Sequence, residues 1–179
     1  MKKILYFLLP FTFGLSSCEK DDICDANTPT TPRLVISFYD ITTPSVRKSV
    51  KRLKVIGEGQ PEGIVFNKSA IDEETKYLTS GDSIAIPLRT GEDSATFTFT
   101  LNSDSTNPTL SNTDQVKINY TRQNVYVSRA CGFKTIYKLA TQNPLEVTDS
   151  GNDGLWIQLA EPENSNIEFE NETHVKVFF

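Results

Sequence analysis

The chain has 179 residues, of which 37% are hydrophobic and 23% are charged, and its formal net charge is −5. This length suits one domain with its own core, and the share of hydrophobic residues excludes a wholly disordered chain. The acidic surplus argues against nucleic acid as a partner, because phosphate binding needs an excess of Lys and Arg.

The first 17 residues have the layout of a secretory signal peptide. Lys2 and Lys3 are positive, Ile4 to Phe13 is an almost unbroken apolar run, and small residues follow at 14–17. The run is shorter than the roughly 20 residues that a membrane-spanning helix needs. We therefore expect residues 1–17 to be cleaved, which leaves 16 basic and 23 acidic residues and a net charge of −7.

Cys18 ends the sequence Leu15-Ser16-Ser17-Cys18, which resembles the lipobox of bacterial lipoproteins. In a lipobox the cysteine becomes the lipidated first residue, and acyl chains then hold the protein to a membrane without spanning it. We expect Cys18 to be this lipidation site, so the first partner of the protein is a membrane. An ordinary signal peptide with a chance cysteine nearby is the alternative.

Three charged residues, Lys20, Asp21 and Asp22, follow the expected anchor. They are similar to the Lys-acid-acid signal that sends Bacteroidota-type lipoproteins to the outer face of the outer membrane. A merely solvated tether is the alternative. We expect attachment to the bacterial outer membrane, with the cell surface slightly favoured over the periplasmic face, and we interpret residues 18–32 as a polar tether.

Two further cysteines, Cys24 and Cys131, remain in what would be an oxidising compartment. A disulfide between them is the economical interpretation, and two free thiols are the alternative. The bridge would close a loop of roughly 100 residues, which chain-entropy estimates value at about 4–5 kcal/mol. A thiol active site is disfavoured because the sequence has no Cys-x-x-Cys motif.

Residues 33–179 show the two-residue alternation that is typical of strands, most clearly where Ala95, Phe97, Phe99 and Leu101 interleave with threonines. The predicted strands, in chain order, are residues 33–41, 50–56, 83–88, 95–101, 115–122, 125–130, 133–139, 155–159 and 175–179. At Gly132 we expect a bulge or a sharp bend. The pattern predicts an all-β, antiparallel β-sandwich as a single domain, and immunoglobulin-like connectivity is one arrangement that fits it.

A family resemblance rests on the lipobox, on Cys24 and on the stretch from Tyr120-Thr121-Arg122 through Val127-Ser128-Arg129-Ala130-Cys131-Gly132-Phe133. These residues look like those of a family of uncharacterised flavobacterial-type (Bacteroidota) lipoproteins. The resemblance covers most of the mature chain, and its most specific part is residues 128–132. The resemblance implies a location in the cell envelope and a pairing of the two cysteines, and it supplies no catalytic residue.

Residues that could carry chemistry each have a simpler structural interpretation. His174, the single histidine, would have to serve any Ser-His-Asp triad or zinc site, but we expect a surface or strand-end residue. Residues 149–154 partly match a calcium loop, although Gly151 and Ala160 stand where oxygen ligands are needed. A turn is the favoured interpretation, so we expect neither a metal nor a cofactor.

Three surface features could bind a glycan, a lipid headgroup or a protein. Glu168, Glu170 and Glu172 would align on one face of a strand as paired carboxylates or as a solvated edge. The other two sets are a basic cluster, Arg47, Lys48, Lys51, Arg52 and Lys54, and the aromatic residues Tyr126, Tyr137, Trp156 and Phe178. For these we favour an exposed charged strand and core packing, respectively.

The function that we predict is therefore a noncatalytic, lipid-anchored module that binds an envelope protein or an extracellular ligand. The alternative is a carboxylate-based hydrolase of glycans, which needs two of Glu168, Glu170, Glu172 and Asp153 in one cleft. A third possibility is a structural part of a larger outer-membrane assembly. That role predicts a contiguous exposed apolar patch.

Overall fold

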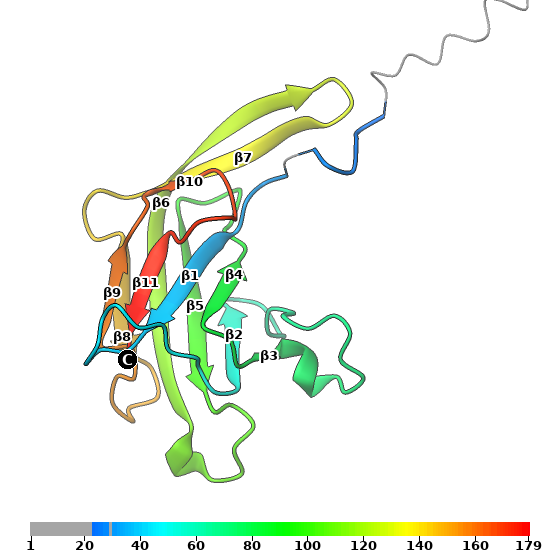
Figure 1. The fold of residues 1–179 in the computed structure, drawn as a ribbon. Coiled ribbons are helices and arrows are strands. Elements are labelled where there is room, and N and C mark those ends of the chain that lie inside the picture. Colours follow the sequence, from blue (N-terminus) through cyan, green and yellow to red (C-terminus); the bar gives the residue numbers. More distant parts are fainter. Residues whose placement is uncertain (1–22, 29) are drawn as a thin grey trace, which may run out of the picture. The chain divides into compact units, whose positions relative to one another are not determined.

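The computed structural model describes residues 23–28 and 30–179, and regular structure in this part is almost entirely strand (Figure 1). The strands are β1 Leu34–Tyr39, β2 Leu53–Gly57, β3 Leu78–Thr79, β4 Ser83–Ile86, β5 Ser94–Leu101, β6 Asn112–Ser128, β7 Gly132–Leu139, β8 Leu145–Asp149, β9 Leu159–Pro162, β10 Asn166–Ile167 and β11 Val175–Phe178. Two 3₁₀ helices, η2 Glu74–Tyr77 and η3 Pro108–Leu110, lie in the connections.

The described residues divide into two compact units, one of residues 23–28 and 30 with 125–134 and one of residues 31–124 with 135–179. The predicted signal peptide, the predicted lipidation site Cys18, and Lys20, Asp21 and Asp22 all lie outside the described residues. Within the described ranges, no helix has the length and apolar character required to cross a bilayer.

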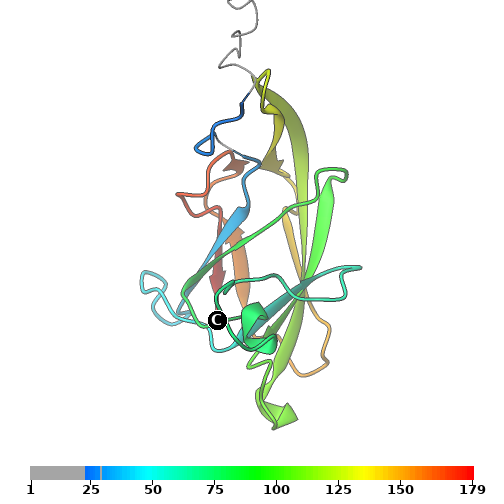
Figure 2. The same cartoon turned by 90° about the vertical axis from the view of Figure 1, so that its right-hand side faces the viewer.

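The larger unit is a sandwich of two sheets that lie face to face (Figure 2). One sheet has the strand order β4-β1-β11-β9, and the other has the order β10-β7-β6-β5-β2-β3. The first part of β6 pairs with β5 on one side and with β8 on the other. The predicted all-β sandwich is confirmed, while the immunoglobulin-like connectivity stays a prediction.

The core follows directly from the alternation in the sequence. Leu34, Ile36 and Phe38 of β1 are buried, as are Phe97 and Phe99 of β5. Because successive side chains of a strand point to opposite faces, this alternation gives each sheet one buried face, and the two buried faces form a common core.

One strand pair departs from the expected antiparallel arrangement. β1 pairs in parallel with β11, with Ile36 opposite Val175 and Phe38 opposite Val177. β11 also pairs antiparallel with β9, so the four-stranded sheet is mixed. The last strand is thereby enclosed between two others, and its Val175 and Val177 side chains are buried in the common core.

Several predicted strand boundaries were wrong. The predicted strands 115–122 and 125–130 form one long strand, β6, and β8 was not predicted at all. Residues 155–158 lie outside the strands, although Trp156 and Ile157 are buried. Of the two alternatives expected at Gly132, the structure has the sharp bend: a hairpin turn over residues 129–131 leads into Gly132, the first residue of β7, which has a φ of +69°.

Candidate functional site

The smaller unit is built around a disulfide between Cys24 and Cys131, which confirms the predicted pair. It joins residues 107 positions apart and brings their Cα atoms to 4.9 Å. The backbone N–H of Cys131 donates to Ser128 Oγ at 3.0 Å, which closes the hairpin turn. Tyr126 and Phe133 stack edge-to-face on this hairpin with ring centroids 5.5 Å apart, and both side chains are exposed.

The larger unit contains a pocket of about 390 Å³ between the loop after β2 and the connection from β4 to β5. Its apolar lining includes Ile64, Leu88 and Phe97. The Arg89 guanidinium lies at its rim, where it donates to Glu92 at 2.8 Å and to the carbonyl oxygen of Glu58 at 2.6 Å. A mainly apolar pocket with a few fixed polar groups suits a small ligand.

A second pocket of about 390 Å³ is acidic, and no sequence pattern pointed to it. Its carboxylates come from Glu62, Glu73, Glu74 and Asp104. The Tyr77 hydroxyl donates to Glu62 at 2.7 Å, and this hydrogen bond is the main cause of the raised pKa of Tyr77. Asp104 accepts from Arg52 at 2.7 Å, and this bond holds the Asp104 pKa below its usual value. The residues are far apart in sequence, so only the fold could show them together.

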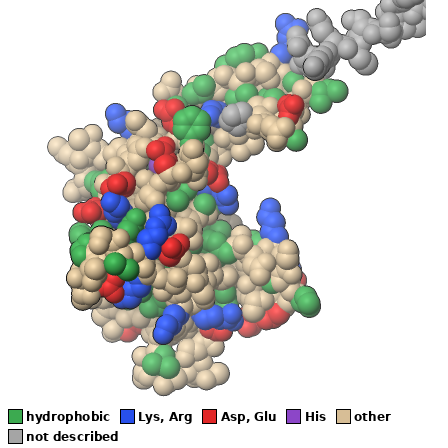
Figure 3. Space-filling view, in the orientation of Figure 1, with side chains coloured by type: hydrophobic (Ala, Val, Ile, Leu, Met, Phe, Trp, Pro, Cys, Tyr) green, Lys and Arg blue, Asp and Glu red, His purple; other side chains and the backbone are tan. Residues whose placement is uncertain are grey.

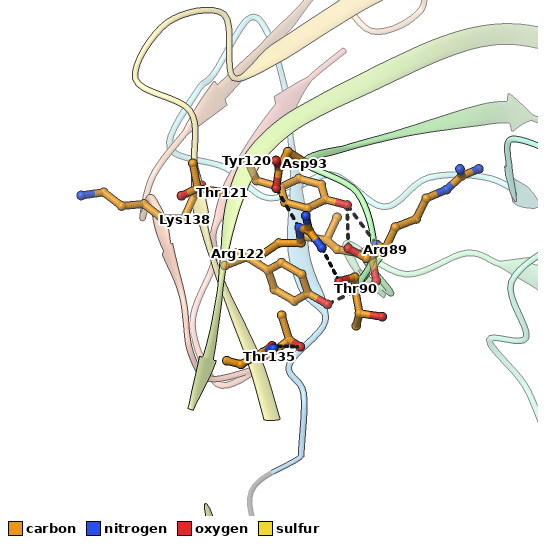
Figure 4. Close-up of polar contacts among 11 residues, drawn as sticks. Arg89, Thr90, Asp93, Tyr120, Thr121, Arg122, Thr135 and Lys138 are labelled. Atoms are coloured by element: carbon orange, nitrogen blue, oxygen red, sulfur yellow. Dashed lines mark hydrogen bonds and ion pairs between the residues drawn. The ribbon is translucent and has the colours of Figure 1, made fainter. Parts of the chain in front are cut away.

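Two buried tyrosines fasten the connection between β4 and β5 to strands β6 and β7 (Figure 4). The Tyr120 hydroxyl donates to the Arg89 carbonyl at 3.1 Å and accepts from the Arg89 N–H at 3.0 Å. The Tyr137 hydroxyl donates to the Leu88 carbonyl at 3.3 Å. Burial raises the pKa of Tyr120 to about 12, so its hydroxyl stays protonated at neutral pH and acts as a structural clamp.

Next to this clamp, Arg122 fixes the start of β5. Its Nε donates to Asp93 at 2.7 Å and its Nη1 donates to the Thr90 carbonyl at 2.6 Å (Figure 4). Arg122 belongs to the stretch that carries the family resemblance. The structure gives this arginine a structural role in shaping the turn between β4 and β5.

The three glutamates expected on one strand face do not form such a row. Residues 168–172 follow the short strand β10 and lie outside the strands. Glu170 accepts two hydrogen bonds from Arg33 Nε at 3.0 Å, which lowers its pKa, and Glu172 accepts from Asn164 at 2.7 Å. Glu168 lines a separate pocket of about 180 Å³. None of the three pockets described here is lined by two of the four carboxylates that the hydrolase hypothesis requires.

The residues of the partial calcium loop form the turn that we expected. Asp149 accepts the backbone N–H groups of Asp153 and Gly154, at 3.3 and 2.9 Å, and these bonds lower its pKa. Asp114, opposite Asp149 in the β6–β8 register, is fully buried and accepts the N–H of Ile157 at 2.8 Å. Among the described residues, no group of three His, Cys, Asp or Glu side chains is placed to hold a metal ion.

His174 immediately precedes β11, as expected for a strand-end residue, but the predicted surface position was wrong. The side chain is fully buried, and Nδ1 accepts the N–H of Val35 at 2.9 Å. Burial lowers the pKa of His174, while Glu172, Glu170 and the backbone of Phe169 act in the opposite direction. The ring therefore serves as a neutral acceptor between β1 and the start of β11.

The basic cluster is largely neutralised. Arg47, Lys48 and Arg52 form ion pairs with Asp82, Asp40 and Asp104. Basic and acidic side chains intermix on the face shown in Figure 3. The predicted aromatic set is not one patch either, because Tyr137, Trp156 and Phe178 are buried and Tyr126 is exposed.

Comparison with known proteins identifies one family. Residues 52–179, which are most of the chain, match the model of a family described as "Family of unknown function (DUF6452)". No curated protein and no solved structure matches the chain.

Proposed function

Because the chain belongs to this family of unknown function, we propose a function from its own residues: a lipid-anchored cell-envelope protein without catalytic activity. Its β-sandwich binds another envelope protein or an extracellular ligand. The anchor lies in the bacterial outer membrane, with the domain on the cell surface.

The observation that carries this proposal is the disulfide. The chain has three cysteines, and the bridge between Cys24 and Cys131 occupies two of them. Cys18 is therefore the cysteine left for lipid, at the end of a lipobox-like sequence. A disulfide also suits a protein that works outside the cytoplasm, where thiols are not kept reduced.

The binding part of the proposal is supported by the pocket beside Arg89. Its volume of about 390 Å³ lies in the range of small-ligand sites, and its apolar wall includes Ile64, Leu88 and Phe97. Tyr120 and Tyr137 hold one side of the pocket in place, because they bond the backbone of Leu88 and Arg89. A preformed wall lowers the entropic cost of binding.

Two measurements on the protein in its native cells test the lipid anchor and the location of the domain on the cell surface. Mass spectrometry of the N-terminal peptide should show acyl chains on Cys18, and the Cys18→Ala variant should lose membrane attachment. An unmodified Cys18 would contradict the proposal. Protease added to intact cells should degrade the domain, whereas protection until lysis would move the domain to the periplasmic face.

A carboxylate-based hydrolase of glycans is the second candidate, with other carboxylates than the four named from the sequence, because the acidic pocket around Glu62 and Tyr77 favours it. If it is correct, the purified protein should release reducing sugar from a glycan, and Glu62→Gln and Asp104→Asn should reduce the rate by at least about 100-fold. Glu168→Gln serves as the matched control, because Glu168 lines another pocket. Equal rates in all variants would exclude this pocket as the catalytic site.

A further inference from the structure

We propose that the tip of the β6–β7 hairpin contacts the lipid–water interface of the membrane that carries the anchor. The contact residues are Tyr126 and Phe133, with Ile23 beside the disulfide cysteine Cys24 in the sequence. The inference rests on the proposed lipidation of Cys18 and adds a second, noncovalent membrane contact to it.

Chain length places the hairpin turn close to the lipid. Cys24 follows Cys18 by six residues, and an extended chain spans at most about 3.6 Å per residue, or roughly 22 Å in total. The disulfide then holds the Cα of Cys131 only 4.9 Å from that of Cys24. A turn more than 100 residues away in sequence is thereby kept within roughly 27 Å of the anchor, which is less than the thickness of about 30 Å of a bilayer's hydrocarbon core.

Near the disulfide, the unit that contains the hairpin exposes large apolar side chains. Exposed fractions are 60% for Tyr126, 69% for Phe133 and 79% for Ile23. Tyr126 and Phe133 also stack on each other, so they present one aromatic surface. Aromatic rings concentrate at membrane interfaces, where the ring meets acyl chains and a tyrosine hydroxyl meets headgroups.

The charge of the hairpin tip also favours a membrane. Over residues 125–134 the charged side chains are Arg129 and Lys134, both basic, although the segment from residue 19 to residue 25 that leads to the disulfide is acidic. Arg129 lies in the turn itself and is exposed. A cation at the tip favours the anionic phosphates of lipid headgroups.

Photo-crosslinking of the complete lipidated chain tests the contact. The protein with Phe133→p-benzoylphenylalanine is reconstituted into vesicles of phosphatidylethanolamine and phosphatidylglycerol, irradiated and analysed by mass spectrometry. Phospholipid adducts at position 133 are expected. The control carries the same reporter at Leu110, which is 59% exposed and lies in the larger unit. Position 110 should give at least about tenfold less lipid adduct, because no disulfide links that position to the anchor.

A second variant tests the role of the disulfide. Cys24→Ser with Cys131→Ser, combined with the reporter at position 133, should lower the lipid adduct several-fold while Cys18 stays lipidated. Adducts with a protein instead of lipid, or equal adducts at positions 110 and 133, overturn the inference and leave the proposed anchor intact. The same spectra report acylation of Cys18, so its absence would overturn the proposed function separately.

Discussion

His174 shows how one buried side chain makes stability depend on pH. Its Nδ1 accepts the N–H of Val35, and burial lowers its pKa below the ordinary value of 6.5. Below that value the unfolded chain takes up a proton that the folded chain does not, so the free energy of unfolding falls as the pH falls. We expect urea unfolding midpoints to decrease between about pH 7 and pH 5.

The control for this prediction is His174→Asn, whose side-chain oxygen can take the place of Nδ1 as the acceptor for Val35. This variant loses packing and is less stable at every pH. Its midpoint should nevertheless change less across the same range. A slope equal to that of the wild type would mean that other groups cause the pH dependence.

Asp114 is another buried titratable group, and its pH dependence has the opposite sign to that of His174. Burial raises its pKa above the ordinary value of 3.8, so its contribution to stability is lost as the pH rises through the folded-state pKa. Asp114→Asn keeps an acceptor for the Ile157 N–H and carries no charge. Its stability relative to the wild type should therefore improve from pH 4 to pH 7, as measured by urea unfolding.

The companion variant Asp114→Ala leaves that N–H without its partner in the core. We expect it to lower the free energy of unfolding by about 1–3 kcal/mol. If Asp114→Ala and Asp114→Asn are equally stable, the hydrogen bond to Ile157 contributes nothing measurable.

At the scale of single residues, the cysteine pair was predicted from the sequence, but the burial of His174 and Asp114 was not. Cysteine pairing follows from the count of thiols and the compartment. Asp114 continues the alternation of Val116, Ile118 and Tyr120, so its burial could have been predicted from this pattern. His174 precedes the last strand, and its burial depends on β1, which lies more than 130 residues earlier in the chain.

Strands with a clear alternation were predicted well, including the four-residue strands β4 and β11, whereas β8 was missed. β5 and β7 match their predicted ranges closely because each has eight residues with a clear period of two. β8 has only Leu145 and Val147 as apolar residues, and both are half-buried. Its identity as a strand depends on pairing with β6, which a local pattern does not contain.

The two tyrosine hydroxyls allow a matched test of the clamp on the β4–β5 connection. Tyr120→Phe removes two hydrogen bonds to Arg89 and should lower the free energy of unfolding by about 1–3 kcal/mol. Tyr137→Phe removes one longer bond to Leu88 and should cost about 0.5–1.5 kcal/mol. Both rings keep their edge-to-face contact at 5.3 Å, so chemical denaturation compares the hydroxyls alone.

Across the whole molecule, the fold class could be predicted from the sequence, but the partners of each strand could not. Alternation tells which residues of β1 and β11 are buried, and it says nothing of parallel pairing between them. The acidic pocket was unpredictable for the same reason, since Glu62 and Tyr77 come from the connection between β2 and β3 and Asp104 comes from the connection between β5 and β6. These features depend on long-range contacts, which also make folding slow because distant segments must meet before they gain stability.

The parallel pairing makes the end of the chain essential to the first strand. β11 lies between β1 and β9, so the four-stranded sheet has no continuous hydrogen bonding without it. Val177→Ala removes buried volume opposite Phe38 and should lower the free energy of unfolding by about 2–3 kcal/mol. Lys176→Ala, on the neighbouring position with a partly exposed ion pair to Glu163, should cost less than about 1 kcal/mol. Equal losses of unfolding free energy at both positions, measured by urea unfolding, would mean that β11 is held by its backbone rather than by its buried face. The expected difference would mean that the core closes only when the last strand docks.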